Sequence, residues 1–428
     1  MNRYSGSERH LLVAESVIPL GSQTFSKSKT QYPVGVSPLF ARKAKGARIQ
    51  DIDGNWYVDL VNSLAAITIG YGDKDISKAV RKQLKKGVIY SLPGVIEAEV
   101  ASLLVELVPS AELVRFGKNG TDATSAAVRL ARAYTGREII AVCGYHGWQD
   151  WYIGSTTRDK GVPLPTKNLT RSFKFNDLDS LSELISEFPN QIAAVVMEPM
   201  NTAFPEKNFL QNVRKLCDEH GIVLVFDETI TGFRFSSGGA QELFDVIPDI
   251  STFGKGLANG FPLSAVVGKR QIMKEMEEIF FSGTFGGELL SLSAAKVVLE
   301  KHKKSKFTSI LASKGENLKV QVQNIINETG LQEVISLSGH PTWIFLNWTP
   351  TSKYSTNQLK TFFMQEMFKY GVLILNSHNI SLAFGKKEQK IVLSAYSKTL
   401  HKLSEGIATE KLQDMLLVEP LTPLFKVR

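Results

Sequence analysis

Short apolar runs alternate with amphipathic segments through the middle of the chain. Residues 138–144, 191–199 and 221–228 read EIIAVCG, QIAAVVMEP and GIVLVFDE and are rich in β-branched residues. Such runs are typical of strands buried on both faces, and helical segments between them imply a mostly parallel sheet. The pattern predicts strands in these runs, a further strand at 112–116 and a helix over about 121–135.

The two ends of the chain have a different pattern. Up to residue 45 the sequence mixes short helical and irregular stretches, and GARIQDIDGNWYVDL then predicts a hairpin turning at Asp53-Gly54. Near the other end, PTWIFLNW and GVLILNS predict strands, and TNQLKTFFMQEMFKYG predicts an amphipathic helix.

These patterns predict an α/β protein with a mostly parallel central sheet flanked by helices. We expect a large domain over residues 57–302. We also expect the N-terminal segment 1–56 and the C-terminal part 303–428 to form a smaller α+β domain together.

The composition narrows the functional classes. Of the 428 residues, 43% are hydrophobic and 21% are charged, and the net charge of +8 is scattered rather than gathered in a nucleic-acid-binding patch. Cys143 and Cys217 are the only cysteines, too few for a disulfide framework or a cysteine-based zinc site. The sequence has no signal-peptide pattern and no apolar run of membrane-spanning length. We expect a cytoplasmic protein that binds small molecules and no nucleic acid, membrane or metal.

Residues with candidate chemistry follow the predicted strands, where ligands collect in an open parallel sheet. The helix start that Thr121 or Asp122 can cap forms an anion site, or else a capped helix that binds nothing. Tyr145 and His146, between two glycines, offer a stacking surface and an imidazole that is otherwise a structural hydrogen-bonding group. Asp227 ends a buried strand, where a carboxylate needs a cation or several donors.

Lys255 lies between Gly254 and Gly256 in TFGKGLANGFPLSA. Alone, this pattern is typical of a solvated loop. Together with an anion site, an aromatic surface and a buried carboxylate, the amine matches one ligand, pyridoxal 5′-phosphate (PLP). Its aldehyde would form a Schiff base with Lys255, and its pyridinium nitrogen would pair with Asp227. We interpret the two glycines as room for this bulky cofactor.

Five segments resemble, in order, the motifs of the class III (fold type I) aminotransferases, most of all the glutamate-1-semialdehyde 2,1-aminomutase branch. They are RFGKNGTDATSAAVRLARAYTGR, GYHGW, DETITGFRFSSGGAQ, PDISTFGKGLANGFPLSAVVG and GTFGGELLSLSAA. The resemblance implies the PLP fold type I, with Lys255 as the Schiff-base lysine and Asp227 as the partner of the pyridine nitrogen.

The same resemblance implies further cofactor-binding residues. Gly120 and Thr121 fall at the phosphate-binding turn, Tyr145 falls at the ring-stacking position with His146 beside it, and Glu198 matches a carboxylate near the site. Thr284 matches a threonine that reaches the phosphate from the second subunit, which implies a homodimer with shared active sites.

Three departures from the family pattern bear on the reaction. Thr229 stands where the family has a valine packed against the ring. PLGSQTFSKSKTQYP offers only Lys27 and Lys29 where the aminomutase has a carboxylate-binding arginine, and Ile380 takes the place of a glutamate in its gating segment. We therefore expect an aminotransferase that moves an amino group from a donor such as glutamate to an aldehyde or ketone, with an oxo-sugar among the candidates. The alternative is the aminomutase. A scaffold protein would need neither Lys255 nor Asp227.

Overall fold

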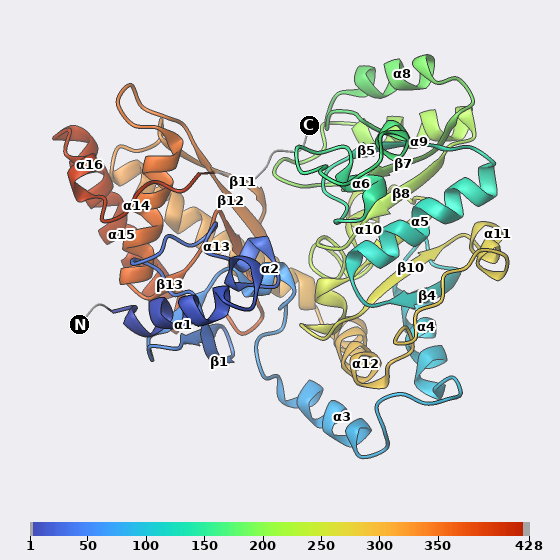
Figure 1. Cartoon of the computed structure of the whole chain (residues 1–428), viewed down its shortest axis with the longest axis horizontal. Helices are drawn as coiled ribbons and strands as arrows, with labels where there is room; N and C mark the ends of the chain where they lie inside the picture. The colour runs from blue at the N-terminus through green and yellow to red at the C-terminus, as the bar shows by residue number, and fades with distance from the viewer. Residues whose placement is uncertain (1–2, 423–428) are drawn as a thin grey trace. The chain divides into compact units, whose positions relative to one another are not determined.

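The computed structural model describes residues 3–422, so the outermost residues of the expected N- and C-terminal parts, 1–2 and 423–428, lie outside the described residues. The chain divides into two compact units, shown in Figure 1. One unit runs from Lys74 to Ser309. The other combines the described residues up to Asp73 with those from Ile310 onward.

The unit from Lys74 to Ser309 is built on a seven-stranded sheet with the order β4-β10-β9-β8-β7-β5-β6. The strands are β4 Leu113–Gly117, β5 Ile139–Cys143, β6 Thr170–Ser172, β7 Ile192–Met197, β8 Val223–Asp227, β9 Ile250–Phe253 and β10 Ser264–Gly268. Strands β5 to β9 are parallel, and β10 runs antiparallel to both of its neighbours. The predicted mostly parallel sheet is therefore confirmed.

Helices cover both faces of this sheet (Figure 1). The helices of this unit are α3 Lys74–Leu84, α4 Val95–Leu107, α5 Gly120–Thr135, α6 Asp150–Ile153, α7 Leu164–Asn168, α8 Leu178–Glu187, α9 Phe209–His220, α10 Ala240–Phe244, α11 Arg270–Met273 and α12 Leu289–Lys304, with short 3₁₀ turns at Lys255–Ala258 and Lys274–Glu277. Helix α5 packs through Ala127 and Leu130 on one face, and α9 packs through Val213 and Cys217 on the other. Because both faces of the central strands are covered, every residue of β5 and β7 is apolar and buried.

Strand register decides which side chains meet at the carboxyl edge of the sheet. Cys143 pairs with Met197, and Met197 pairs with Phe226. Asp227 pairs with Thr252. The residues that directly follow β5, β7 and β9 therefore emerge beside Asp227 at the end of β8.

The unit of the chain ends contains two small sheets, with the orders β1-β2-β3-β13 and β11-β12-β14. The strands are β1 Ala41–Lys45, β2 Arg48–Asp51, β3 Trp56–Asp59, β11 Ile335–His340, β12 Trp343–Trp348, β13 Val372–Leu373 and β14 Ser377–Asn379. The helices are α1 Ser5–Glu15, α2 Asn62–Ala65, α13 Phe307–Glu328, α14 Thr356–Lys369, α15 Lys386–Ala408 and α16 Leu412–Met415, with 3₁₀ turns at Pro19–Gly21 and Phe25–Lys27.

The sequence patterns of the chain ends are largely confirmed. Strands β2 and β3 form the antiparallel hairpin predicted around Asp53-Gly54, and α14 occupies the predicted amphipathic segment. The run GVLILNS contributes only the two-residue strand β13 before the chain turns toward β14. Within residues 3–422, no helix has the length and hydropathy needed to cross a membrane.

Candidate active site

Asp227 is the buried carboxylate at the centre of the carboxyl edge. It is 4% exposed. Its Oδ1 accepts hydrogen bonds from the backbone N–H of Thr229 at 3.1 Å and from the hydroxyl of Thr252 at 3.2 Å. Burial alone would raise the pKa of Asp227, but the hydrogen bond and charge of His146 and the hydrogen bond from the Thr229 backbone lower it below its ordinary value. The carboxylate is therefore held ionised in a dry site.

His146 supports Asp227 from the protein side. It is 2% exposed, with Nδ1 at 2.9 Å from Asp227 Oδ2 and Nε2 at 3.2 Å from the carbonyl oxygen of Cys143. Both ring nitrogens thus face oxygen acceptors, an arrangement that only the imidazolium, with two N–H groups, satisfies in full. The structure gives His146 the role of a buried hydrogen-bonding group whose direct contact is with Asp227.

The glycines on either side of Tyr145 and His146 have separate steric reasons. Gly144 has φ +107° and Gly147 has φ +109°, in the region that favours glycine. A Cβ on Gly144 would lie 2.5 Å from Glu198 Oε2, and a Cβ on Gly147 would lie 2.4 Å from Thr121 Oγ1. The GYHG turn therefore packs directly against two other predicted site residues.

Glu198, directly after β7, is a second buried carboxylate. Its Oε2 accepts hydrogen bonds from the backbone N–H of Tyr145 at 3.1 Å and from the side-chain amide of Asn201 at 2.6 Å. Burial, and then the charge of Asp227, raise the pKa of Glu198 above its ordinary value. Tyr145 itself is 46% exposed, so its ring is open for stacking.

Lys255 follows β9 at the same edge. Its φ is +41°, in the left-handed region that non-glycine residues adopt at a cost of about 1–3 kcal/mol and mostly at functional sites. Desolvation lowers the pKa of Lys255, although the charges of Glu198 and Asp227 oppose the shift. A lowered pKa increases the neutral amine fraction, which is the nucleophilic form.

Gly254 lies in close contact with two other parts of the site. A Cβ at Gly254 would lie 3.3 Å from Thr229 Cγ2 and 3.7 Å from Gly120 Cα. A Cβ at Gly120 would lie 3.0 Å from the same Thr229 methyl group. The bare backbone of Gly254 lets the Lys255 turn pack against Thr229 and the start of α5, and room for a cofactor beside the two glycines stays a prediction.

The start of α5 carries unsatisfied polar groups. Asp122 Oδ2 accepts the backbone N–H groups of Lys118 and Asn119, so Asp122 does the capping. The buried hydroxyl of Thr121 has no hydrogen-bond partner within the described part of the chain. The buried hydroxyls of Thr229 and Ser264 are also unpaired there. Each such group typically costs about 1–3 kcal/mol until it is satisfied.

Whether PLP fits this site depends on whether its groups can satisfy the unpaired hydroxyls and the charges described above. A phosphate offers several acceptor oxygens to the Thr121 hydroxyl and to backbone N–H groups at the positive end of α5. Asp227 can pair with a protonated ring nitrogen, and Lys255 can reach an aldehyde. The groups at this edge of the sheet therefore fit PLP.

In residues 3–422, no cluster of histidine, cysteine and acidic side chains could hold a metal ion.

Thr284 has no contact with Asp227 or Lys255 that the structure establishes. It is exposed on the segment 280–286, which together with Lys118 and Arg129 lines a cavity of about 390 Å³. The proposal of a shared site therefore depends on a second subunit.

Two site features escaped the sequence analysis. Thr252 donates to Asp227 because register places them side by side. Glu228, next to Asp227 in sequence, is also buried, but it accepts the backbone N–H groups of Ala240 at 2.8 Å and Gln241 at 2.9 Å. Asp227 is therefore a candidate for the chemistry, whereas Glu228 has a structural role.

Comparisons with known proteins identify the family. The family model for aminotransferase class-III matches residues 31–387. 3-Aminobutyryl-CoA aminotransferase from Cloacimonas acidaminovorans (strain Evry) is 31% identical over 406 residues, covering 93% of this chain and 95% of that relative. Glutamate-1-semialdehyde 2,1-aminomutase from Aquifex aeolicus (strain VF5) is 38% identical over 365 residues, covering 80% of this chain and 86% of that relative.

A solved structure agrees with these relatives. The FumI protein of Sphingopyxis sp. MTA144, in a form that carries PLP, matches with a TM-score of 0.88 at 26% identity, over 96% of this chain and 98% of that chain. The expected fold type I and the expected cofactor are confirmed. The chain belongs to the class III aminotransferases, a family of PLP-dependent enzymes.

Proposed function

We propose that this enzyme transfers an amino group from a donor such as glutamate to a small aldehyde or ketone, with an oxo-sugar among the candidate acceptors, and that Lys255 and Asp227 carry the chemistry. The observation that carries the proposal is the meeting of these two residues at adjacent strand ends, beside the unpaired hydroxyl of Thr121. When bound, PLP supplies an electron sink for removal of the substrate α-proton.

In this proposal, the protein's own residues bind, orient and move protons. Gly120 and Thr121 would hold the phosphate at the start of α5, and Tyr145 and Thr229 would contact the ring. Asp227 holds the proton on the ring nitrogen, a charge-assisted hydrogen bond that typically contributes about 1.5–3 kcal/mol. Lys255 would act as the base that takes the proton from the substrate α-carbon and as the acid that returns it, and such positioned acid–base catalysis typically contributes about 10²–10⁴-fold.

Two further residues act around this set. His146 acts on the ring through Asp227, with which it shares a hydrogen bond. Glu198 places a carboxylate beside the Tyr145 turn, where it accepts the backbone N–H of Tyr145.

The relatives include both an aminotransferase and an aminomutase, so the family alone does not decide between the two reactions. An aminomutase must retain a bifunctional intermediate. Of the two lysines in the segment that resembles the arginine site, Lys29 is paired with Glu15. Lys27 is the remaining candidate to bind the substrate carboxylate, and its ammonium group lacks the bidentate geometry of an arginine side chain. Weaker retention of the intermediate favours its release and the transfer of the amino group to a second carbonyl compound.

We propose a cytoplasmic homodimer as the working form of this enzyme.

The decisive experiment supplies the PLP-loaded enzyme with glutamate and no acceptor. We expect release of about one equivalent of 2-oxoglutarate per active site, measured by mass spectrometry, and none from Lys255→Ala. Glutamate 1-semialdehyde without a donor should give little 5-aminolevulinate. Efficient conversion of that semialdehyde would overturn the proposal and identify an aminomutase.

Asp227→Asn tests the role of the buried carboxylate. The amide cannot hold the ring nitrogen protonated as a carboxylate does, so we expect the reaction with glutamate to slow by about 10- to 150-fold, the equivalent of one charge-assisted hydrogen bond. Stopped-flow absorbance of the bound cofactor measures the rate, and the unfolding midpoint of the variant controls for folding. A wild-type rate would assign Asp227 another role.

The contact between Gly147 and Thr121 gives a test of the phosphate site. In Gly147→Ala, the new methyl group would displace the Thr121 hydroxyl, and we expect PLP affinity to fall about tenfold or more, as for loss of a hydrogen bond to a charged group. Gly161→Ala is the matched control, since Gly161 has φ +91° and no atom within 4 Å of an added Cβ. Equal PLP affinities in spectroscopic titrations of the two variants would contradict the assignment of Thr121.

Mixing variants tests the shared-site homodimer. Thr284→Ala should weaken PLP binding if Thr284 completes the partner subunit's phosphate site. Heterodimers formed with Lys255→Ala chains then contain one intact site, and mixing should raise activity above that of the Thr284→Ala enzyme alone. A fully active monomer in analytical ultracentrifugation would refute the proposal.

A further inference from the structure

Thr229 lies where three parts of the candidate active site meet. Its backbone N–H donates to Asp227 Oδ1 at 3.1 Å. Its methyl carbon Cγ2 would lie 3.0 Å from a Cβ added at Gly120 and 3.3 Å from one added at Gly254. The backbone hydrogen bond and these two close contacts hold the Thr229 side chain between the start of α5 and the turn that carries Lys255.

The hydroxyl of Thr229 is buried and unpaired. Its Oγ1 has no hydrogen-bond partner among residues 3–422. Asp227 Oδ1, to which the Thr229 backbone donates, already accepts that N–H and the hydroxyl of Thr252. Since a carboxylate oxygen has about two acceptor sites, Oδ1 has no further site for the Thr229 hydroxyl.

The identity of this residue makes the unpaired hydroxyl informative. Thr229 stands where the family pattern has a valine, a residue of nearly the same shape without a polar group. Burying a hydroxyl without a hydrogen bond destabilises the folded chain, and a valine would avoid that cost. A ligand that accepts a hydrogen bond from Thr229 explains why this chain has a threonine here.

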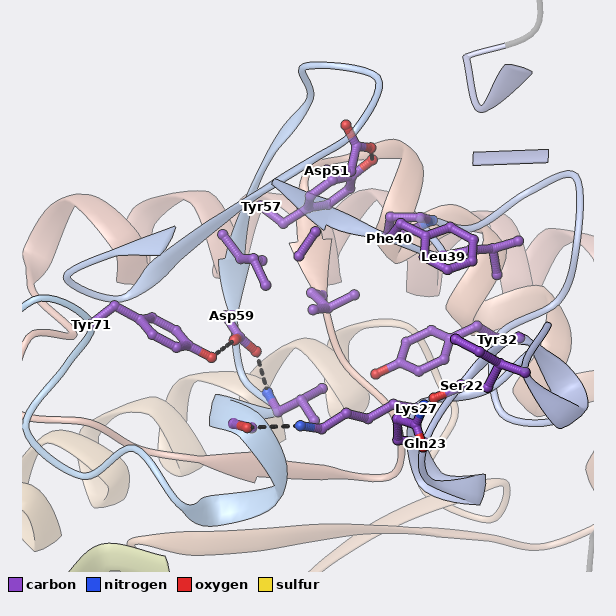
Figure 2. Close-up of a pocket in the computed structure, with 18 residues that line it drawn as sticks. Ser22, Gln23, Lys27, Tyr32, Leu39, Phe40, Asp51, Tyr57, Asp59 and Tyr71 are labelled. Carbon is purple, nitrogen blue, oxygen red and sulfur yellow. Dashed lines mark hydrogen bonds between the residues drawn. The ribbon is translucent and has the colours of Figure 1, made fainter. Parts of the chain in front are cut away.

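Polar side chains at a cavity in the other unit are paired within the protein. This cavity, of about 420 Å³, lies in the unit of the chain ends (Figure 2). Asp59 accepts the hydroxyl of Tyr71 at 2.6 Å, and Lys27 donates to the Ser63 hydroxyl at 3.1 Å. The protein itself provides partners for these hydroxyls, whereas it provides none for the Thr229 hydroxyl within the described chain.

The start of α5 indicates which ligand group the hydroxyl binds. Thr229 Oγ1 would lie 3.3 Å from a Cβ added at Gly120, the first residue of α5. The hydroxyl of Thr121, the next residue, is also buried and without a partner in the part of the chain that the structure describes. Two unused hydroxyl donors thus lie at one helix start, whose dipole favours a negative charge.

We propose that the Thr229 hydroxyl donates a hydrogen bond to the PLP phosphate, so that this chain holds the phosphate with a side-chain donor that a valine cannot provide. The inference rests on the proposed phosphate site at Gly120 and Thr121 and adds a residue to it. The phosphate has more acceptor oxygens than any other group of PLP. A hydroxyl that donates to a phosphate oxygen makes a charge-assisted bond, about twice as strong as a neutral one.

Spectroscopic titrations with PLP and with pyridoxal, which lacks the phosphate, test the proposal. We expect Thr229→Val to weaken PLP binding about 10- to 150-fold, the equivalent of one hydrogen bond to a charged group, and to leave pyridoxal binding unchanged. Thr229→Ser keeps the hydroxyl and should retain the wild-type ratio of PLP affinity to pyridoxal affinity. Wild-type PLP affinity in Thr229→Val, or equal losses for PLP and pyridoxal, would overturn the assignment to the phosphate.

The stability of the full chain without PLP gives a second readout. Thr229→Val removes a buried, unpaired hydroxyl, so we expect its unfolding midpoint to rise above that of the wild type. Thr329→Val is the matched control, because Thr329 is buried and its hydroxyl donates to the Ile325 carbonyl oxygen at 2.8 Å. This control should lower the midpoint and leave PLP affinity unchanged. A lowered midpoint in Thr229→Val would show that the protein already pairs the hydroxyl and would contradict the proposal.

Failure of this inference is distinguishable from failure of the proposed function, since the titrations measure binding without turnover. If Gly147→Ala weakens PLP binding and Thr229→Val does not, the phosphate site at Thr121 stands and the role of Thr229 is refuted. If neither variant weakens PLP binding, the phosphate site is refuted together with the role of Thr229. An enzyme whose PLP affinity depends on the Thr229 hydroxyl but that releases no 2-oxoglutarate from glutamate would support the phosphate contact and refute the proposed reaction.

Discussion

Burial of the Asp227 carboxylate is the constraint on which the candidate active site depends. An ionised carboxylate taken out of water must be compensated by charge and hydrogen bonds, or it becomes protonated. Here His146, Thr252 and the backbone of Thr229 provide that compensation. His146 must in turn be held by the Cys143 carbonyl oxygen, which fixes the turn after β5. One buried charge thus links the ends of β5, β8 and β9.

Close packing of these turns follows from the same constraint. The turn that carries His146 can approach the start of α5 and Glu198 only because Gly147 and Gly144 have no side chains. The turn that carries Lys255 approaches Thr229 and Gly120 through Gly254. Glycine here provides contact between protein segments, and the order of the site comes from mutual packing of loops that have little regular structure of their own.

The sequence predicted those features that depend on local pattern. Apolar β-branched runs predicted β5, β7 and β8, because strands buried on both faces need such residues. Features set by register or by distant contacts were beyond sequence patterns. The pairing of His146 with Asp227, separated by 81 positions, is one of them. The contact of Gly254 with Thr229 is another, because nothing in the sequence shows that the two residues lie side by side. The structural role of Glu228 depends likewise on α10, 12 residues later.

The candidate active site carries some of the chain's costs to folding. Lys255 is left-handed, and Thr121 has a buried hydroxyl without a partner among the described residues. Each feature opposes folding in the absence of a ligand, so the surrounding structure must compensate, as the apolar core on both faces of the main sheet does. A cofactor or substrate that forms hydrogen bonds with the unpaired hydroxyl offsets part of that cost when it binds. Its binding energy therefore adds to the stability of the folded chain, and ligand recognition and folding are coupled through the same few residues.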